Sequence, residues 1–405
     1  MNSRSKFVVV MSSTCLVTLL LLGSMLSKGA PAETPGTGVY RHLAVYTEVL
    51  SRIKGEYVEE PDMKNVTLGA LNGMLESLDP FASYLNADQY KEYLKNYDSF
   101  KGDVGLVLSK KFGYIMVVDV VPGSPAAKAG LSTGDYIEAI KGVATRDMPL
   151  AYGQLLLKGA SGSTIDITVL RRKPEPQKMT LTRSAIVYPT VASKMLDGQI
   201  GYIKPESLAN GKVKEIATAI ETLQKQNAKS LILDLRSCGV GGPDEGVDLA
   251  NLFLDKGLMG YVQGQRFPRK DYNADPKKGL THLPMVVITN RGTANGAEVA
   301  AAALQQDKRA ELVGEHTYGY ASIRQAVTME DGGAIILSVA KYYGPDGKAI
   351  QDLGVTPENL VGEPDTQVEV DEEGVPIGKD EVQTTKPGDD LLLKKAVEVV
   401  QKRAA

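Results

Sequence analysis

Side chains that could act in covalent catalysis are concentrated between residues 238 and 341 of this 405-residue chain. Of the two cysteines, Cys15 lies near the N-terminus, and Cys238, beside the glycine-rich stretch Gly239–Gly242, would be a lone thiol once the N-terminal segment is removed. Hydroxyl groups and basic side chains follow it: Thr293, Ser322, Lys308, His316 and Lys341. A hydroxyl held next to a base is the pair that acyl-transfer enzymes use, because the base removes the proton of the nucleophile. The sequence does not fix which of these groups meet, so such a pair stays one alternative. No base is evident for Cys238, and we expect a buried, inert thiol.

Metal, cofactor and nucleic-acid chemistry find little support in the composition. His42, His282 and His316 fall in different segments and lack the close spacing of metal ligands, so we expect no metal and no cofactor. Lys and Arg total 46 against 49 Asp and Glu, a net charge of −3, so no basic excess predicts binding to nucleic acid. Hydrophobic residues at 43% and charged residues at 23% are typical of a soluble globular protein. At roughly 150 residues per domain, the length predicts two or three domains.

The first 32 residues have the pattern of an export segment. Arg4 and Lys6 precede an apolar run over 7–26, and Ala30-Pro31-Ala32 follows it. A basic start, an apolar middle and an A-x-A end predict a signal peptide over residues 1–32, cleaved after Ala32. The run approaches the length that spans a bilayer, so an uncleaved membrane anchor is the alternative. Either way we expect an exported protein in the periplasm or cell envelope, with membrane association through this segment if it is retained.

The remaining chain divides into four predicted segments. Residues 33–98 begin with a short linker and continue with apolar positions three and four apart, which predicts a small all-helical region that Asp79-Pro80 ends. Residues 99–185 alternate β-rich runs with turns and two short helices, at about 123–130 and 150–157. Residues 186–362 alternate strands and helices, which predicts an α/β layer structure. Residues 363–405 are an acidic linker followed by a helix.

The strands and helices of the third segment are expected to position the candidate chemistry. Its predicted strands cover 200–203, 231–235, 285–289, 311–313 and 335–340, and its predicted helices cover 212–226, 245–254 and 296–306. The glycine-rich loop follows the second of these strands, and the last of these helices begins directly after Asn295. Asn295 therefore fits an N-cap, and Glu298, three residues later, completes the pattern of a capping box.

Several strings, in order along the chain, carry a family resemblance. They are Leu-Glu-Ser-Leu-Asp-Pro at 75–80 with Ser-Tyr-Leu at 83–85, Gly-Ser-Pro-Ala at 123–126 with Ala-Gly-Leu at 129–131, Leu-Asp-Leu-Arg at 233–236, Tyr-Tyr-Gly-Pro-Asp-Gly-Lys at 342–348, and Gly-Val-Thr-Pro at 354–357. Together they resemble the carboxy-terminal, or tail-specific, processing serine peptidases. The resemblance implies an α/β core of the ClpP/crotonase type over 186–362, an inserted PDZ domain over 99–185 and an N-terminal helical region.

The resemblance also places the catalytic positions, and all three are substituted. In this family the nucleophile lies in a Ser-Ala-Ser-Ala-Ser-Glu string, a lysine base follows 25 residues later, and a glutamine lies four residues beyond the lysine. In this chain these positions hold Asn295, Tyr320 and Arg324. An amide is a poor acyl-transfer nucleophile, a phenol near its reference pKa of about 10 stays protonated, and a guanidinium keeps its proton in proteins. We expect Tyr320 and Arg324 to fill the former cleft, with a new polar binding site as the alternative.

The oxyanion side of the expected site is altered as well. Where the family has Pro-Gly-Gly, this chain has Gly239-Val240-Gly241, and Gly296 follows the nucleophile position. Val240 is more restrictive than glycine where the backbone approaches a ligand closely.

The PDZ-like segment needs no catalytic residue to function. PDZ domains add a peptide as an extra strand and hold its terminal carboxylate on backbone N–H groups. Here the matching stretch contains Gly105, Leu106 and Val107, and Leu155 or Leu156 is expected to line an apolar pocket with Leu106.

The sequence therefore predicts an exported pseudopeptidase that binds protein or peptide C-termini. It would act as a scaffold or a regulator, with an envelope protein or an active homologous peptidase as partner. One alternative is an active serine-type endopeptidase that processes envelope proteins from their C-termini with a relocated nucleophile. Another is a structural envelope protein whose PDZ groove is closed and whose PDZ fold is kept only for packing.

Overall fold

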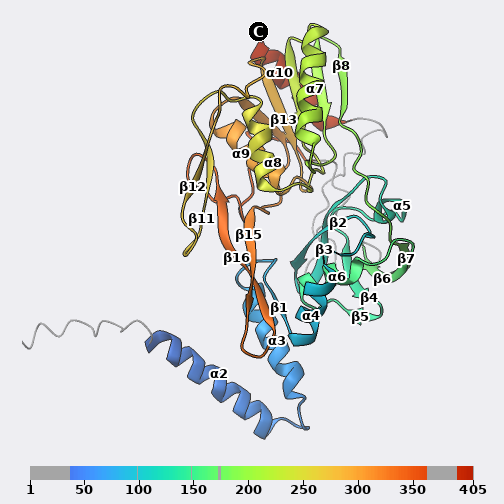
Figure 1. Cartoon of the computed structure of the whole chain (residues 1–405), viewed down its shortest axis with the longest axis vertical. Coiled ribbons are helices and arrows are strands. Elements are labelled where there is room, and N and C mark those ends of the chain that lie inside the picture. The colour runs from blue at the N-terminus through green and yellow to red at the C-terminus, as the bar shows by residue number, and fades with distance from the viewer. Residues whose placement is uncertain (1–36, 98, 147, 172–174, 363–389, 405) are drawn as a thin grey trace, which may run out of the picture. The chain divides into compact units, whose positions relative to one another are not determined.

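The computed structural model describes residues 37–97, 99–146, 148–171, 175–362 and 390–404 (Figure 1). Two compact units divide the chain, residues 1–67 and residues 68–405. The first holds helix α2 (Thr37–Glu56) and the start of α3 (Met63–Glu76). None of the described helices is both long and apolar enough to cross a bilayer. The predicted export segment, Cys15 and most of the predicted acidic linker lie outside the described residues.

A mostly parallel sheet forms the centre of the second unit. Its strand order is β17-β14-β13-β10-β9-β8, and β8 alone among these six runs antiparallel to its neighbour. The strands are β8 (Ala192–Leu196), β9 (Ile200–Lys204), β10 (Ser230–Asp234), β13 (Met285–Thr289), β14 (Ala310–Gly314) and β17 (Asn359–Leu360). β10 and β13 are continuous buried runs, which is the pattern of parallel strands that are covered on both faces.

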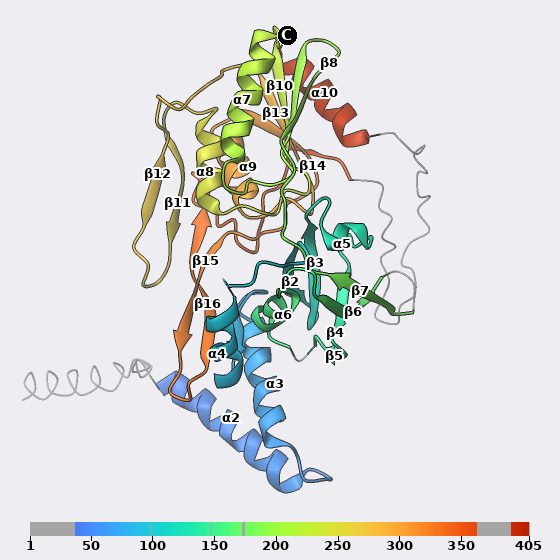
Figure 2. The ribbon, with the colours of Figure 1, turned by 45° about the vertical axis from the view of Figure 1, so that its right-hand side comes forward.

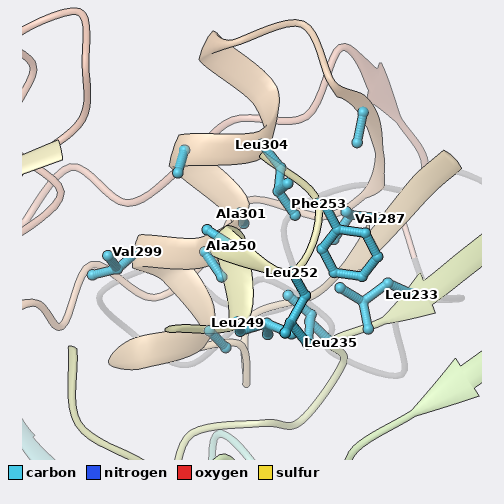
Figure 3. Packing of buried hydrophobic residues seen from close by; sticks show 14 of the residues in the cluster. Leu233, Leu235, Leu249, Ala250, Leu252, Phe253, Val287, Val299, Ala301 and Leu304 are labelled. Atoms are coloured by element: carbon cyan, nitrogen blue, oxygen red, sulfur yellow. The ribbon is translucent and has the colours of Figure 1, made fainter. Parts of the chain in front are cut away.

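Helices cover both faces of this sheet. Three lie on one face and pack in one large hydrophobic cluster: α7 (Lys212–Lys225), α8 (Pro243–Asn251) and α9 (Gly296–Gln306). Figure 3 shows Leu249 of α8 and Leu304 of α9 in this cluster with Leu233 and Val287 from the sheet. The predicted C-terminal helix is α10 (Leu391–Ala404), and it packs on the other face against Ile232 and Val286. Alternate residues of one strand thus serve opposite layers.

A second, antiparallel sheet extends from the core in strand order β1-β16-β11-β12, with β15 paired to β16 (Figure 2). Its strands are β1 (Ser83–Leu85), β11 (Leu258–Gln263), β12 (Lys270–Asn273), β15 (Ser322–Thr328) and β16 (Ala334–Tyr343). The expectation of an all-helical region before residue 98 is wrong at β1, which lies between α3 and α4 (Ala87–Asn96). β1 forms because it pairs with β16, some 250 residues away in sequence.

The third sheet, in strand order β2-β3-β4-β6-β7 with β5 beside β4, forms the β-rich module. The elements of the module are β2 (Leu106–Lys111), β3 (Tyr114–Val120), α5 (Pro125–Lys128), β4 (Tyr136–Ile140), β5 (Val143–Ala144), α6 (Leu150–Leu157), β6 (Thr164–Leu170) and β7 (Gln177–Thr182). β2 is an edge strand, and α6 packs against it. The module therefore has the open strand edge beside a helix that strand addition of a peptide requires.

A charged cluster joins α10 to the central sheet. The Arg236 guanidinium donates to Asp234 at 2.6 Å and to Asp390 at 2.8 Å, and Asp234 is fully buried. Asp390 also caps α10, since its Oδ1 accepts the N–H of Leu393 at 2.9 Å. Burial opposes ionisation of Asp390, but the hydrogen bonds from Arg236 and Leu393 outweigh it and lower its pKa.

Replacing Arg236 by Ala should lower the free energy of unfolding by about 3–5 kcal/mol, because buried Asp234 loses its charged partner. Asp390→Ala should cost about 1 kcal/mol through the lost helix cap. Urea denaturation of both variants measures the two losses. Lys402→Ala, on an exposed ion pair of α10, is the control and should stay within about 0.5 kcal/mol. An Arg236 variant as stable as the Asp390 variant would contradict this account.

Candidate functional site

Three loops meet at one edge of the central sheet. They follow β10, β13 and β14, which are neighbouring parallel strands, and they cover residues 235–242, 290–295 and 315–321. The carboxyl ends of parallel strands open at the same edge, which is where α/β proteins place their sites. The fold therefore brings together the glycine-rich loop, Asn295 and Tyr320.

Asn295 occupies a sharp turn at the start of α9. Its backbone has φ 55° and ψ −127°, a region that a non-glycine residue rarely adopts. A strained strand-to-helix turn of this kind exposes the nucleophile in α/β hydrolases. Here its side-chain Nδ2 donates to the carbonyl of Gly239 at 2.8 Å, and its backbone N–H donates to the carbonyl of Tyr320 at 3.0 Å.

The prediction of a capping box at Asn295 is wrong. Asn295 is the N-cap residue, but its side chain makes no capping hydrogen bond. The positive φ turns the amide toward Gly239 instead of the helix, and the Glu298 N–H donates to the Asn295 backbone carbonyl at 3.0 Å. The carboxylate of Glu298 is also engaged elsewhere.

Glu298 holds the loop that carries Tyr320. Its carboxylate is fully buried and accepts the hydroxyl of Thr317 at 2.5 Å, the N–H of Gly319 at 2.6 Å and the N–H of Tyr320 at 2.7 Å. Burial raises the pKa of Glu298 to about 7, although these hydrogen bonds work in the opposite direction. The carboxylate thus fixes the position of Tyr320 relative to α9.

Tyr320 fills space between the core and the β-rich module. Tyr320 is 6% exposed, and its ring stacks on Phe81 with ring centroids 4.0 Å apart. Arg324 donates a hydrogen bond to the Tyr320 hydroxyl and lies over the Phe81 ring at 5.4 Å. Burial raises the pKa of Tyr320, so its phenol stays protonated. The side chains of Tyr320 and Arg324 meet, whereas Asn295 meets Tyr320 through the backbone and turns its side chain toward Gly239.

The residues of the expected oxyanion region lie in two close backbone segments. Gly296 donates to the carbonyl of Gly241 at 3.2 Å, and a Cβ on Gly296 would lie 2.3 Å from the carbonyl of Gly242. Gly241 has φ +119°, where a side chain would be strained. Within the described part of the chain, the N–H groups of Val240 and Gly241 donate no hydrogen bond. These two backbone N–H groups therefore have no partner among the described residues.

Among the described residues, neither Thr293 nor Ser322 hydrogen-bonds to a base, although Ser322 lies directly opposite Lys341 in the β15–β16 pair. The Thr293 hydroxyl is buried and donates to the carbonyl of Leu235 at 2.8 Å, and that of Ser322 faces Ser338 at 3.1 Å. Cys238 is fully buried, and burial raises the pKa of its thiol. The candidate bases contact other groups. His316 Nδ1 lies 2.7 Å from the Thr317 carbonyl oxygen, and Lys341 Nζ donates to Asp352 at 2.7 Å. Lys308 lines a pocket with His282 and Arg309. Lys308 lies beyond the far end of the 11-residue helix α9, which is about 16 Å long and begins directly after Asn295.

The predicted peptide-binding residues surround the start of β2. Gly105 has φ +82°, and a Cβ there would lie 2.3 Å from Ser124. Leu106, Val107 and Leu156 are half-buried, whereas Leu155 is 1% exposed and belongs to the interior. Of the two leucines considered for the pocket wall, Leu156 is therefore the one that a ligand can reach.

A carboxylate of the chain itself already occupies part of the predicted carboxylate loop. Asp103 Oδ1 accepts the N–H of Val104 at 2.6 Å and that of Gly105 at 3.1 Å. The N–H of Leu106 lies on the open edge of β2, and it is the donor that remains for a ligand.

Comparison with known proteins shows the family. The profile of peptidase family S41 matches residues 199–361, and that of the PDZ domain matches residues 116–171. The chain is 31% identical over 352 residues to the carboxy-terminal processing protease CtpA of Bacillus subtilis, covering 86% of this chain and 74% of that protein. The chain belongs to the carboxy-terminal processing peptidases of family S41.

Further comparisons agree with this membership. A carboxyl-terminal-processing protease of Synechocystis is 32% identical over 321 residues, covering 77% of this chain and 75% of that protein. The solved photosystem II D1 C-terminal processing protease superposes with a TM-score of 0.64 at 26% identity, covering 82% of this chain and 89% of that chain. The predicted α/β peptidase fold with a PDZ domain is thereby confirmed.

Sequence analysis missed one residue that joins the PDZ domain to the S41 core. Asp119 of β3 is 1% exposed, and its Oδ2 accepts the N–H of Gly239 at 2.8 Å. Its Oδ1 is buried and has no partner among the described residues. Burial raises the pKa of Asp119 to about 6, although the backbone hydrogen bonds from Gly239 and Val120 act to lower it. The available signal was a lone charge inside the apolar run Tyr114–Val121.

Asp119 should make stability depend on pH with a defined sign. Its pKa is about 6 in the folded chain against about 3.9 unfolded, so its contribution is present in full below about pH 4 and is lost as pH rises through 6. The wild-type free energy of unfolding, minus that of Asp119→Asn, should therefore fall by about 2–3 kcal/mol between pH 4 and pH 8. Urea unfolding across this range measures the difference, in which the titration of Glu298 cancels. A difference that is constant or rises with pH would contradict the assignment.

Proposed function

We propose that this chain is a non-hydrolysing member of its family that binds the C-terminal segments of exported proteins. The observation that carries the proposal is the packing of Tyr320, whose protonated phenol lies between Phe81 and Arg324 at the position predicted for the base. The position predicted for the nucleophile holds the Asn295 amide, which is committed to Gly239. A Ser–Lys type of mechanism needs a hydroxyl and a neutral amine, and these positions supply neither.

The PDZ domain supports binding as the remaining activity. Strand addition to β2 uses backbone groups and a nearby apolar wall, both of which the chain has. The printed names of the relatives describe proteases that process carboxyl termini, which favours polypeptide C-termini as the ligand class. The protein would act in the periplasm or cell envelope as a scaffold, or as a regulator of an active relative or an envelope protein.

Catalysis by a relocated nucleophile is the competing function, and an assay of hydrolysis distinguishes it from the proposal. The chain without residues 1–32 should not hydrolyse unfolded protein or apolar-tailed peptides, and Asn295→Ala should behave identically. Mass spectrometry of the products measures turnover directly. Turnover that Asn295→Ala abolishes would refute the inactive assignment, and turnover lost only in Thr293→Ala or Ser322→Ala would identify the relocated nucleophile.

Recognition of a terminal carboxylate can be tested with a matched pair of peptides. A peptide with a free C-terminus should bind more tightly than its amidated form, because the Leu106 N–H faces the open edge. Asp103→Asn should improve binding of the free form about two- to fivefold, since it removes a negative charge beside the loop. Fluorescence polarisation measures both. Asp166→Asn, on β6 of the same domain, is the control and should change nothing; equal affinity for both peptides would exclude carboxylate recognition.

A further inference from the structure

The outer edge of β2 is open over its first half and covered over its second half. β2 pairs only with β3 among the described strands, so alternate backbone groups of β2 face away from the sheet. The N–H of Lys110 is one of these, and it donates to the carbonyl of Pro80 at 2.9 Å. Because these groups alternate along a strand, the backbone N–H and C=O groups of Leu106 and Leu108 also face outward, and no described strand pairs with them there.

The segment Pro80–Ser83, here called the stop segment, is held rigidly in this place. Asp79 Oδ1 accepts the N–H groups of Phe81 at 2.8 Å and of Ala82 at 2.9 Å, which fixes the turn. The Ser83 hydroxyl accepts the N–H of Ala151 at 3.2 Å, so the segment reaches the first turn of α6. Phe81 is 1% exposed and packs in one cluster with the interior of the PDZ domain.

We propose that the stop segment sets the length of peptide that the PDZ groove accepts, limiting strand addition to about the last three residues of a C-terminus. The inference rests on the proposed peptide-binding function. It identifies the ligand as a short C-terminal tail whose preceding residues leave the groove before Lys110. The stop segment occupies the backbone position that the next residues of a longer ligand would need.

The rise per residue along a β-strand sets this limit on the number of ligand residues. A ligand carboxylate at the Leu106 N–H places the final residues of the ligand antiparallel to Leu106 and Leu108. Successive residues advance about 3.3 Å, so the residue that would pair with Lys110 lies about 13 Å from the start of β2. That pairing position already holds the Pro80 carbonyl. The ligand must therefore turn away after about three residues.

A wild-type length series provides the main test. Peptides of two, three, four, six and eight residues that share one apolar C-terminal sequence and a free carboxylate would compete with a labelled tracer. Affinity should rise up to three residues and then stay within about twofold, because no further backbone pairs form. A six-residue peptide that binds about tenfold more tightly than the three-residue peptide, the gain expected from a pair of backbone hydrogen bonds, would overturn the stop.

A matched pair of variants at Asp79 tests the cause. Asp79→Asn keeps an oxygen that can accept both N–H groups, whereas Asp79→Ala removes it and loosens the turn. Longer peptides should gain about tenfold in affinity over the three-residue peptide in Asp79→Ala and should show no gain in Asp79→Asn. Circular dichroism confirms that each variant is folded. Faster hydrogen exchange of the Phe81 N–H would show that the turn has loosened in Asp79→Ala. If affinity in that folded, loosened variant still does not depend on peptide length, the stop is overturned. A chain that binds no peptide of any length would instead refute the proposed function itself.

Discussion

The buried carboxylate of Glu298 is the interaction on which the arrangement of the site depends. It accepts hydrogen bonds from Thr317, Gly319 and Tyr320, and so it ties the loop after β14 to the first turn of α9. A buried carboxylate with three donors is costly to disturb, because removing any partner leaves a polar atom unsatisfied away from water. The position of Tyr320, and through it the stack on Phe81 and the hydrogen bond from Arg324, follows from this anchor.

The turn that carries Asn295 is held in a strained conformation by its surroundings. Asn295 keeps a strained backbone at φ 55°, which costs on the order of 1–3 kcal/mol and persists only where the surroundings impose it. Its neighbours impose it twice, through the carbonyl of Tyr320 and through the carbonyl of Gly239. The packing of Gly241 and Gly296 against adjacent backbone allows no larger residue without movement. Tertiary contacts and close backbone packing therefore hold this geometry in place.

Local patterns in the sequence predict the regular elements well and the long-range contacts poorly. The predicted bounds 285–289 and 296–306 coincide with β13 and α9, since an apolar run and a turn before a helix are local signals. β1 has only three residues and exists because β16 pairs with it, so no local pattern indicates it. The contacts of Asp119 with Gly239 and of Phe81 with Tyr320 join segments more than a hundred residues apart. The sequence also suggests a cap at Asn295, and the positive φ that prevents it is set by tertiary contacts.

The ring of Phe81 links the two parts of the molecule that could bind a polypeptide. On one side it packs with the interior of the PDZ domain, and on the other it stacks on Tyr320 at the edge of the central sheet. The backbone next to it, at Pro80, occupies the edge of β2. A ligand that displaced this backbone would have to disturb the stack, and a ligand that entered beside Tyr320 would have to disturb the edge of β2. A short ligand that leaves the Pro80 carbonyl in place would disturb neither the stack of Phe81 on Tyr320 nor the covered half of the β2 edge.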